Sequence, residues 1–197
     1  MREIELPITQ TFSLTIDLHR LAEDQGEEVD GVRRIPLGNI VDGEKMKITE
    51  LARKNGGKIL YATTSIERQM ESLLLSYFMG PFAGHSQKRA MFENEILQSS
   101  VLTFHAKKEL VKKVIDEGNL LPGASKNQAH KYMKQVMEWR NAFAHGKIQY
   151  DSMKGCLINY YSGSKKILLL NDEYWENVEN TFKECSELLK NAYENMH

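Results

Sequence analysis

From about Thr49 onward, apolar residues recur at three- and four-residue steps, which is the pattern of amphipathic helices. The first helical stretch starts near Thr49, which can cap it, and ends at the glycine–proline break of Gly80 and Pro81. The spacing therefore predicts one long helix here. Its predicted apolar stripe consists of Ile59, Ala62, Ile66, Met70, Leu73 and Tyr77.

Two further helical regions follow this break. The first is predicted as a short helix, a kink near Ser99 and Ser100, and a helix from about Ala106 to Glu117 that ends at Gly118. The second is predicted to begin with Ser125 as its N-cap and to end at Gly146. The predicted apolar seam of this second helix consists of Ala129, Met133, Val136, Arg140 and Phe143.

After Gly146 the apolar period changes to two. The segments "CLINYY" and "KILLL" flank "SGSK", a pattern that is typical of a β-hairpin. The last region is helical again, because Asn171 can cap it and Leu170 and Trp175 have the spacing of a hydrophobic staple. Its predicted buried stripe consists of Trp175, Val178, Phe182, Cys185, Leu189 and Ala192.

The first 48 residues have a different pattern. Apolar residues alternate at Ile4, Leu6 and Ile8, and again from Phe12 to Leu18, which indicates short strands. We interpret "AEDQGEEVDG" as an acidic loop and "VRRIPLGNIVDG" as irregular. The chain therefore divides into an N-terminal appendage, partly strand and partly irregular, at residues 1–48 and a helical domain at residues 49–197. The predicted fold is mainly α, a bundle of four to five helices with a small β-hairpin before the last helix.

Composition limits the classes of partner. The 197 residues carry a formal net charge of −1, so a nucleic-acid site must be a local patch. Two cysteines, Cys156 and Cys185, cannot staple a chain of this length, which favours a reducing, cytoplasmic setting. No apolar stretch has the length or position of a signal peptide or a membrane span, so no membrane association is expected. The sequence has neither a metal-ligand spacing nor a phosphate-binding glycine loop, so we expect no metal and no other cofactor.

The segment "RNAFAHG" gathers three polar groups near one helix end. Asn141 and His145 are four residues apart and project from the same side of a helix, and Arg140 is adjacent. This trio suits cleavage of a phosphodiester. His145 can act as a general base, Arg140 can stabilise charge on phosphorus, and Asn141 can position either group. RNA supplies its own 2′-hydroxyl nucleophile, so no metal is required.

Several of these features have a second interpretation that spacing alone leaves open. Arg140 can pair with a carboxylate of another helix, such as Glu67 or Glu71, and His145 can cap carbonyl groups. The aromatic residues of the motif helix either stack on bases or lie in the core. These aromatic residues are Tyr132, Trp139 and Phe143.

Lysines form two clusters that are either phosphate contacts or solvated helix surface. The cluster just before the motif is the predicted RNA-binding set, and it consists of Lys126, Lys131 and Lys134. The other cluster consists of Lys107, Lys108, Lys112 and Lys113.

The segment "RNAFAHG" resembles the signature of the HEPN superfamily, helical domains marked by an arginine, four to six residues and a histidine. The polar residue that usually follows the arginine is Asn141 here. The order of helices over residues 57–195 also resembles that family, whereas the first 45 or so residues are not covered. The resemblance implies that the helical bundle predicted above has an HEPN-like fold. It also implies a site composed of Arg140, Asn141 and His145.

The same resemblance implies a metal-independent endoribonuclease that acts as a toxin or in defence against phage. Such proteins work as twofold homodimers whose motif helices face each other across an RNA cleft, which would explain an arginine on an apolar seam. The implied partners are RNA, a second copy of the chain and an antitoxin or regulatory protein. Other members keep the fold without cleavage, so the alternative is a dimerising module that binds a nucleotide or a protein.

Overall fold

The computed structural model describes residues 3–6, 27–29, 32–34, 43–80 and 86–196, and most of this part of the chain is helical. A small antiparallel sheet precedes the last helix. The prediction of a mainly helical fold with a small β element before the last helix is therefore confirmed. The helical elements are α1 (Gly43–Met79), α2 (Gln87–Met91), the π-helical turn η2 (Phe92–Leu97), α3 (Phe104–Glu117), α4 (Gly123–His145) and α5 (Asp172–Glu194).

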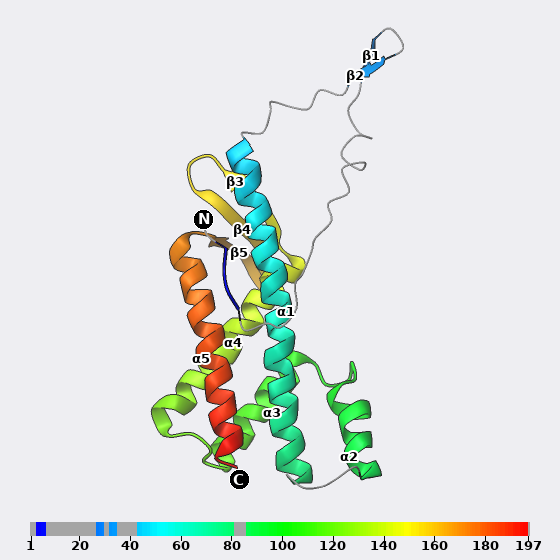
Figure 1. The fold of residues 1–197 in the computed structure, drawn as a ribbon, viewed down its shortest axis with the longest axis vertical. Coiled ribbons are helices and arrows are strands. Elements are labelled where there is room, and N and C mark those ends of the chain that lie inside the picture. The colour runs from blue at the N-terminus through cyan, green and yellow to red at the C-terminus, as the bar shows by residue number, and fades with distance from the viewer. Residues whose placement is uncertain (1–2, 7–26, 30–31, 35–42, 81–85, 197) are drawn as a thin grey trace.

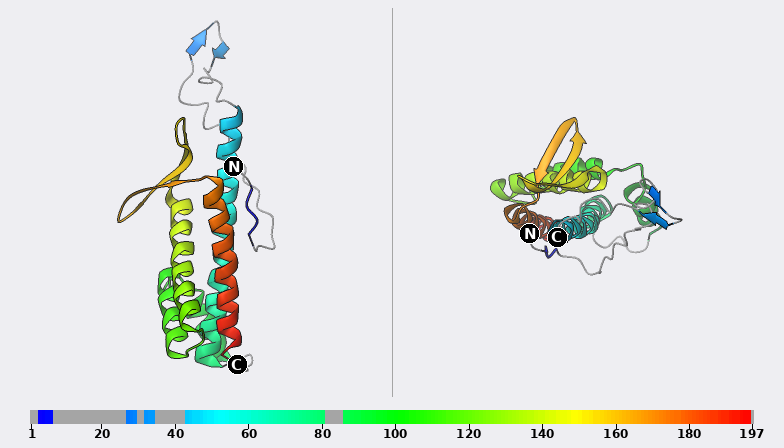
Figure 2. Two further views of the ribbon diagram at one scale, coloured as in Figure 1. Left: turned by 90° about the vertical axis from the view of Figure 1, so that its left-hand side faces the viewer. Right: turned by 90° about the horizontal axis from the view of Figure 1, so that it is seen from above.

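The long helices enclose one apolar core. Viewed from above in Figure 2, α1 and α5 lie side by side and α4 covers one side of the pair. The predicted stripe of α5 is buried at every position, from Trp175 to Ala192, as expected. The stripe of α1 is buried from Ile59 to Leu73, but Tyr77, close to the C-terminal end of the helix, is 38% exposed.

Two predicted helix starts were wrong. Helix α1 begins at Gly43, six residues before Thr49, whose hydroxyl donates to the carbonyl of Lys45 inside the helix (2.9 Å). Helix α4 begins at Gly123 after an N-cap at Pro122, so Ser125 lies within its first turn. Asn171 caps α5 as predicted, because its Oδ1 accepts a hydrogen bond from the Tyr174 N–H (2.8 Å).

The sheet has three strands rather than the two of the predicted hairpin. It consists of β3 (Lys147–Asp151), β4 (Gly155–Ser162) and β5 (Ser164–Leu169), antiparallel in that order. The hairpin between β4 and β5 is confirmed, with Gly163 at φ +71° between the paired Ser162 and Ser164. Strand β3 was missed because it is a short, largely exposed edge strand, in which only Ile148 and Tyr150 alternate with polar residues.

The N-terminal prediction was only partly correct. Strands β1 (Glu27–Val29) and β2 (Val32–Arg34) pair antiparallel where we expected loop and irregular chain. Residues 3–6 form no strand, but Ile4 and Leu6 are buried in the helical core between α1 and α5 (Figure 1). The remaining alternating residues, from Ile8 to Leu18, lie outside the described residues. The helical core therefore includes a segment that we had assigned to an appendage.

Candidate functional site

Arg140, Asn141 and His145 lie together on the last two turns of α4. Arg140 and His145 are exposed and Asn141 is half-buried. The guanidinium of Arg140 donates from Nη1 to Oδ1 of Asn141 at 3.3 Å, and within the described chain it makes no ion pair. The imidazole of His145 has no hydrogen-bond partner among the described residues. All three side chains are thus accessible to a ligand from outside the bundle.

Arg140 does not lie on the apolar seam, and that prediction was wrong. After Val136, the buried stripe continues through Trp139 and Ala142 rather than through Arg140. A helix of 3.6 residues per turn can extend a stripe by three or four residues, and here the step is three. Glu67 and Glu71 were the alternative partners for Arg140, but both bond Lys107 instead. Because Arg140 is not on the apolar seam, its position gives no argument for a dimer interface.

The aromatic residues of α4 belong mainly to the core. Trp139 stacks on Phe182 with ring centroids 6.2 Å apart, and its edge meets Tyr174 at 6.0 Å. The ring centroid of Phe143 lies 5.9 Å from that of Trp175. Tyr132 is half-buried against the same core. These contacts confirm the structural interpretation and anchor the inner face of α4, so the motif residues on the outer face have a fixed base.

Gly146 ends α4 because of space, not because of backbone handedness. Its φ of −87° is open to any residue, but a Cβ would lie 2.3 Å from the Ala142 carbonyl oxygen and 2.7 Å from Cγ1 of Ile158. The Gly146 N–H donates to that same carbonyl at 2.7 Å. The chain therefore turns tightly from His145 into β3, which pairs with β4 under the end of the helix.

The predicted RNA-binding lysines are only partly free. Lys126 pairs with Asp116 of α3 at 3.2 Å, whereas Lys131 and Lys134 are exposed and have no ion-pair partner among the described residues. His130 also faces Asp116, at 3.7 Å. Burial lowers the pKa of His130, and the opposing charge of Asp116 does not compensate. Lys131 and Lys134 remain as candidates for phosphate contacts on the face that carries Asn141 and His145.

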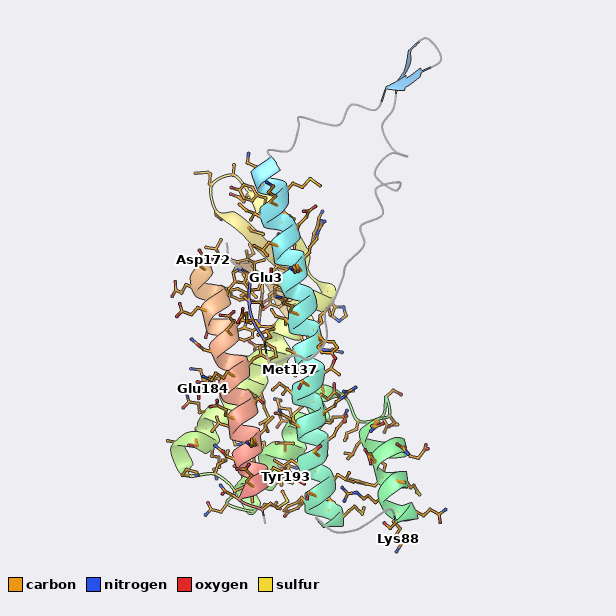
Figure 3. The ribbon with its side chains drawn as sticks, viewed as in Figure 1. Glu3, Lys88, Met137, Asp172, Glu184 and Tyr193 are labelled. Atoms are coloured by element: carbon orange, nitrogen blue, oxygen red, sulfur yellow. The ribbon has the colours of Figure 1, made fainter. Side chains whose placement is uncertain are left out.

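Charge divides between the two sides of the bundle. Helix α4 carries four basic residues and one acidic residue, whereas α5 carries seven acidic and two basic residues, histidines aside. Figure 3 shows Asp172 and Glu184 on the side of α5 that is turned away from α1. The net charge of −1 thus hides a local basic face on α4, and a polyanion is attracted to that face rather than to α5.

Lys107 was predicted to belong to a surface cluster, and this was wrong. It is 3% exposed, and its ammonium bonds Glu67 at 2.6 Å and Glu71 at 2.5 Å. These three residues line a polar cavity of about 540 Å³ between α1, η2 and α3. Glu67 and Glu71 are one helical turn apart on α1, and that spacing was the only sequence signal for a shared cation.

A second, more apolar cavity of about 430 Å³ lies beside the end of α4. Thr64 lines both cavities, so they adjoin along α1. The residues that line this second cavity are Arg53, Gly56, Gly57, Leu60, Tyr61, Thr64, Phe143 and Ile148. We refer to it below as the α1–α4 cavity. Sequence reasoning missed it, because it is formed by residues of α1 together with Phe143 and Ile148, which are 79 to 95 positions further along the chain.

Comparisons with family models, with curated proteins and with solved structures found no match to this chain. Within the described residues, no group of three His, Cys, Asp or Glu side chains has an arrangement suited to a metal ion. No helix in that part of the chain is both long and apolar enough to cross a membrane.

Proposed function

We propose that this chain is an HEPN-type endoribonuclease that cleaves RNA without a metal ion. The observation that supports this best is that Arg140 and His145 are both exposed near the end of the basic helix α4, with the half-buried Asn141 between them and bonded to Arg140. A structural arginine or histidine would be expected to bond a carboxylate or a carbonyl of the bundle. Within the described chain these two do neither, so their side chains are available for a ligand.

The reaction follows from the chemistry of the three groups. Neutral His145 accepts the proton of a ribose 2′-hydroxyl, and the 2′-oxygen attacks the adjacent phosphorus. Arg140 stabilises the negative charge that gathers on the phosphoryl oxygens, and Asn141 orients the guanidinium through the bond between them. The bond from phosphorus to the 5′-oxygen breaks. The products are a 2′,3′-cyclic phosphate and a 5′-hydroxyl.

The departing 5′-oxygen needs a proton, and this requirement favours a twofold dimer. One protomer presents a single histidine at the end of α4, and that histidine has just been used as the base. If two protomers meet through the outer faces of α4, His145 of the partner subunit can serve as the acid. We therefore propose a homodimer with a composite site. Light scattering at micromolar concentration tests it, and a monomer would contradict it.

The cellular role belongs to the same proposal. Both cysteines are buried and free of disulfide bonds, which suits a cytoplasmic protein. A cytoplasmic ribonuclease of this kind acts as a toxin or a phage-defence effector, and an antitoxin or regulatory protein would cover the α4 face. Growth arrest on expression of the wild type, and none with His145→Ala, is the expected result.

The decisive experiment is incubation of the purified protein with single-stranded RNA in the presence of EDTA. We expect cleavage with cyclic-phosphate ends, and none with His145→Ala at equal melting temperature. Cleavage that stops in EDTA and returns with magnesium would contradict the mechanism. If the wild type does not cleave RNA at all, the non-catalytic alternative, a module that binds a nucleotide or a protein partner, takes its place.

A further inference from the structure

The α1–α4 cavity owes its shape to glycine. Gly56 lies against the ring of Phe143, because a Cβ there would be 2.5 Å from Cδ1. This contact brings the backbone of α1 close to α4. The next residue, Gly57, lines the cavity as bare backbone. Glycine is unfavourable in the middle of a helix, yet α1 has two in succession here, and both line the cavity.

The lining of the cavity matches a flat ring with an anionic substituent. Tyr61 and Phe143 contribute aromatic rings, and Leu60 and Ile148 contribute aliphatic surface. The charged residue in the lining is Arg53, which is exposed and has no ion-pair partner within the described chain. Aromatic side chains bind nucleobases by stacking, and a guanidinium binds phosphate through paired donors. A nucleotide combines both features.

The position of the cavity relative to the motif indicates which nucleotide it would take. At about 100° per residue, and turning around α4 in the direction that passes through Asn141, Arg140 lies roughly 60° from Phe143 and His145 roughly 200°. On that side of the helix Arg140 therefore lies between the cavity and His145, whereas the opposite side passes through the buried Ala142. A base in the cavity would belong to a nucleotide beside the cleaved phosphate rather than to that phosphate itself.

The adjoining polar cavity limits the direction of the strand. It is lined by Glu67, Glu71 and Glu93, and it contains the cations Lys107 and Arg68. Lys107 is already bonded to Glu67 and Glu71. With Glu93 as a third carboxylate in the lining, this cavity has little attraction for a phosphate. A strand whose base enters the α1–α4 cavity is therefore directed toward the basic face of α4.

We propose that the α1–α4 cavity is a base-binding subsite of the RNA strand, with Tyr61 stacking on the base, Phe143 forming part of the cavity wall and Arg53 binding a phosphate. This rests on the proposed ribonuclease function, but the subsite itself binds mononucleotides and so can be tested without cleavage. The probes are adenosine 5′-monophosphate, adenosine and inorganic phosphate, titrated into the full-length protein by calorimetry or by NMR.

We expect adenosine 5′-monophosphate to bind more tightly than adenosine or phosphate. Arg53→Ala should weaken the monophosphate about tenfold and leave adenosine unchanged. Tyr61→Ala should weaken both by at least about fivefold. Arg68→Ala is the matched control, since it removes an exposed arginine from the same helix at the other cavity, and it should change neither.

The outcomes separate the subsite from the catalytic proposal. Monophosphate binding that depends on Arg53 and Tyr61 supports the subsite, even if the wild type cleaves no RNA. In an active enzyme, Arg53→Ala should raise KM with little change in kcat. No binding at millimolar monophosphate, or equal losses in Arg53→Ala and Arg68→Ala, would overturn the subsite while leaving cleavage at His145 unaffected. Because Arg53 is exposed, its variant is expected to fold, and melting temperatures check this.

Discussion

Gly56 of α1 and Phe143 of α4 are in such close contact that no larger residue fits at position 56. A Cβ there would be 2.5 Å from Cδ1 and 3.1 Å from Cε1 of the ring. The ring cannot easily move away, because its other side faces Trp175 at a centroid distance of 5.9 Å. This contact fixes the distance between α1 and the helix that carries the candidate site.

Gly56→Ala should therefore destabilise the protein. Overpacking costs about 1–3 kcal/mol, and the better helix propensity of alanine offsets about 1 kcal/mol of it. We expect a net loss of roughly 1 kcal/mol, or about 2–4 °C in Tm. The control is Gly43→Ala, at a position of the same helix where a Cβ meets nothing within 4 Å. Thermal unfolding that shows equal stability for both variants would contradict the close contact.

Lys107 should be among the most sensitive charged residues of the core. Its replacement by Met leaves Glu67 and Glu71 without their cation in a partly buried site, which costs about 3 kcal/mol when a buried pair is broken. Lys108→Met is the matched control, because Lys108 pairs with the exposed Glu109 and should lose less than about 1 kcal/mol. Urea unfolding of the two variants measures the difference, and equal midpoints would refute the buried cluster.

The same cluster predicts a loss of stability in alkali. Burial lowers the pKa of Lys107, but the hydrogen bonds to Glu67 and Glu71 outweigh it and hold the pKa above its ordinary value of 10.5. A group whose pKa is raised by folding stabilises the protein fully below the unfolded value and progressively less as the pH rises through the folded value. The stability difference between wild type and Lys107→Met should therefore be constant at neutral pH and shrink above pH 10.5.

Glu3 predicts the opposite dependence at low pH. It bonds Lys58 and Lys54, the latter at 2.9 Å, and these two bonds lower its pKa to about 2. Figure 3 shows Glu3 between α1 and α5, where it helps to hold residues 3–6. Its contribution should be present above pH 4.5 and lost as the pH falls toward 2, and exposure keeps it below about 1 kcal/mol. An NMR titration should show that Lys58→Met raises the pKa of Glu3, whereas Lys47→Met leaves it unchanged.

Sequence patterns predicted the long helices well because their apolar residues recur over many turns. The stripe of α5 from Trp175 to Ala192 has the largest amphipathic contrast, and every predicted position is buried. Helix starts were less predictable, since Thr49 and Ser125 are good capping residues that tertiary structure did not use. Capping propensity identifies residues that can begin a helix, but packing decides which of them does.

Part of the geometry of the candidate site could be predicted from the sequence, but not its surroundings. The spacing of Asn141 and His145 on one helix was sufficient to place them on one face. The orientation of Arg140 was not, because a stripe that reaches Val136 can continue at Trp139 or at Arg140, and only contact with α5 selects Trp139. Likewise, the isolation of Lys107 from its neighbouring lysines depends on α1, which no local pattern in α3 reveals.

The last prediction separates the roles of the three motif residues. His145→Ala should lower the cleavage rate about 10²–10⁴-fold with RNA binding nearly unchanged, because it removes a proton acceptor and no fixed charge. Arg140→Ala should weaken both binding and rate, and Arg140→Lys should restore binding better than rate, since lysine lacks the forked donors. Asn141→Asp should be worse than Asn141→Ala, because its carboxylate would hold the guanidinium of Arg140 and repel a phosphate.

As Arg140 and His145 are exposed, their variants should stay within about 0.5 kcal/mol of wild-type stability. Cleavage, RNA affinity and melting temperature are measured for each variant. If the Ala variants instead unfold the protein or dissociate a dimer without a separate catalytic defect, the three residues are structural.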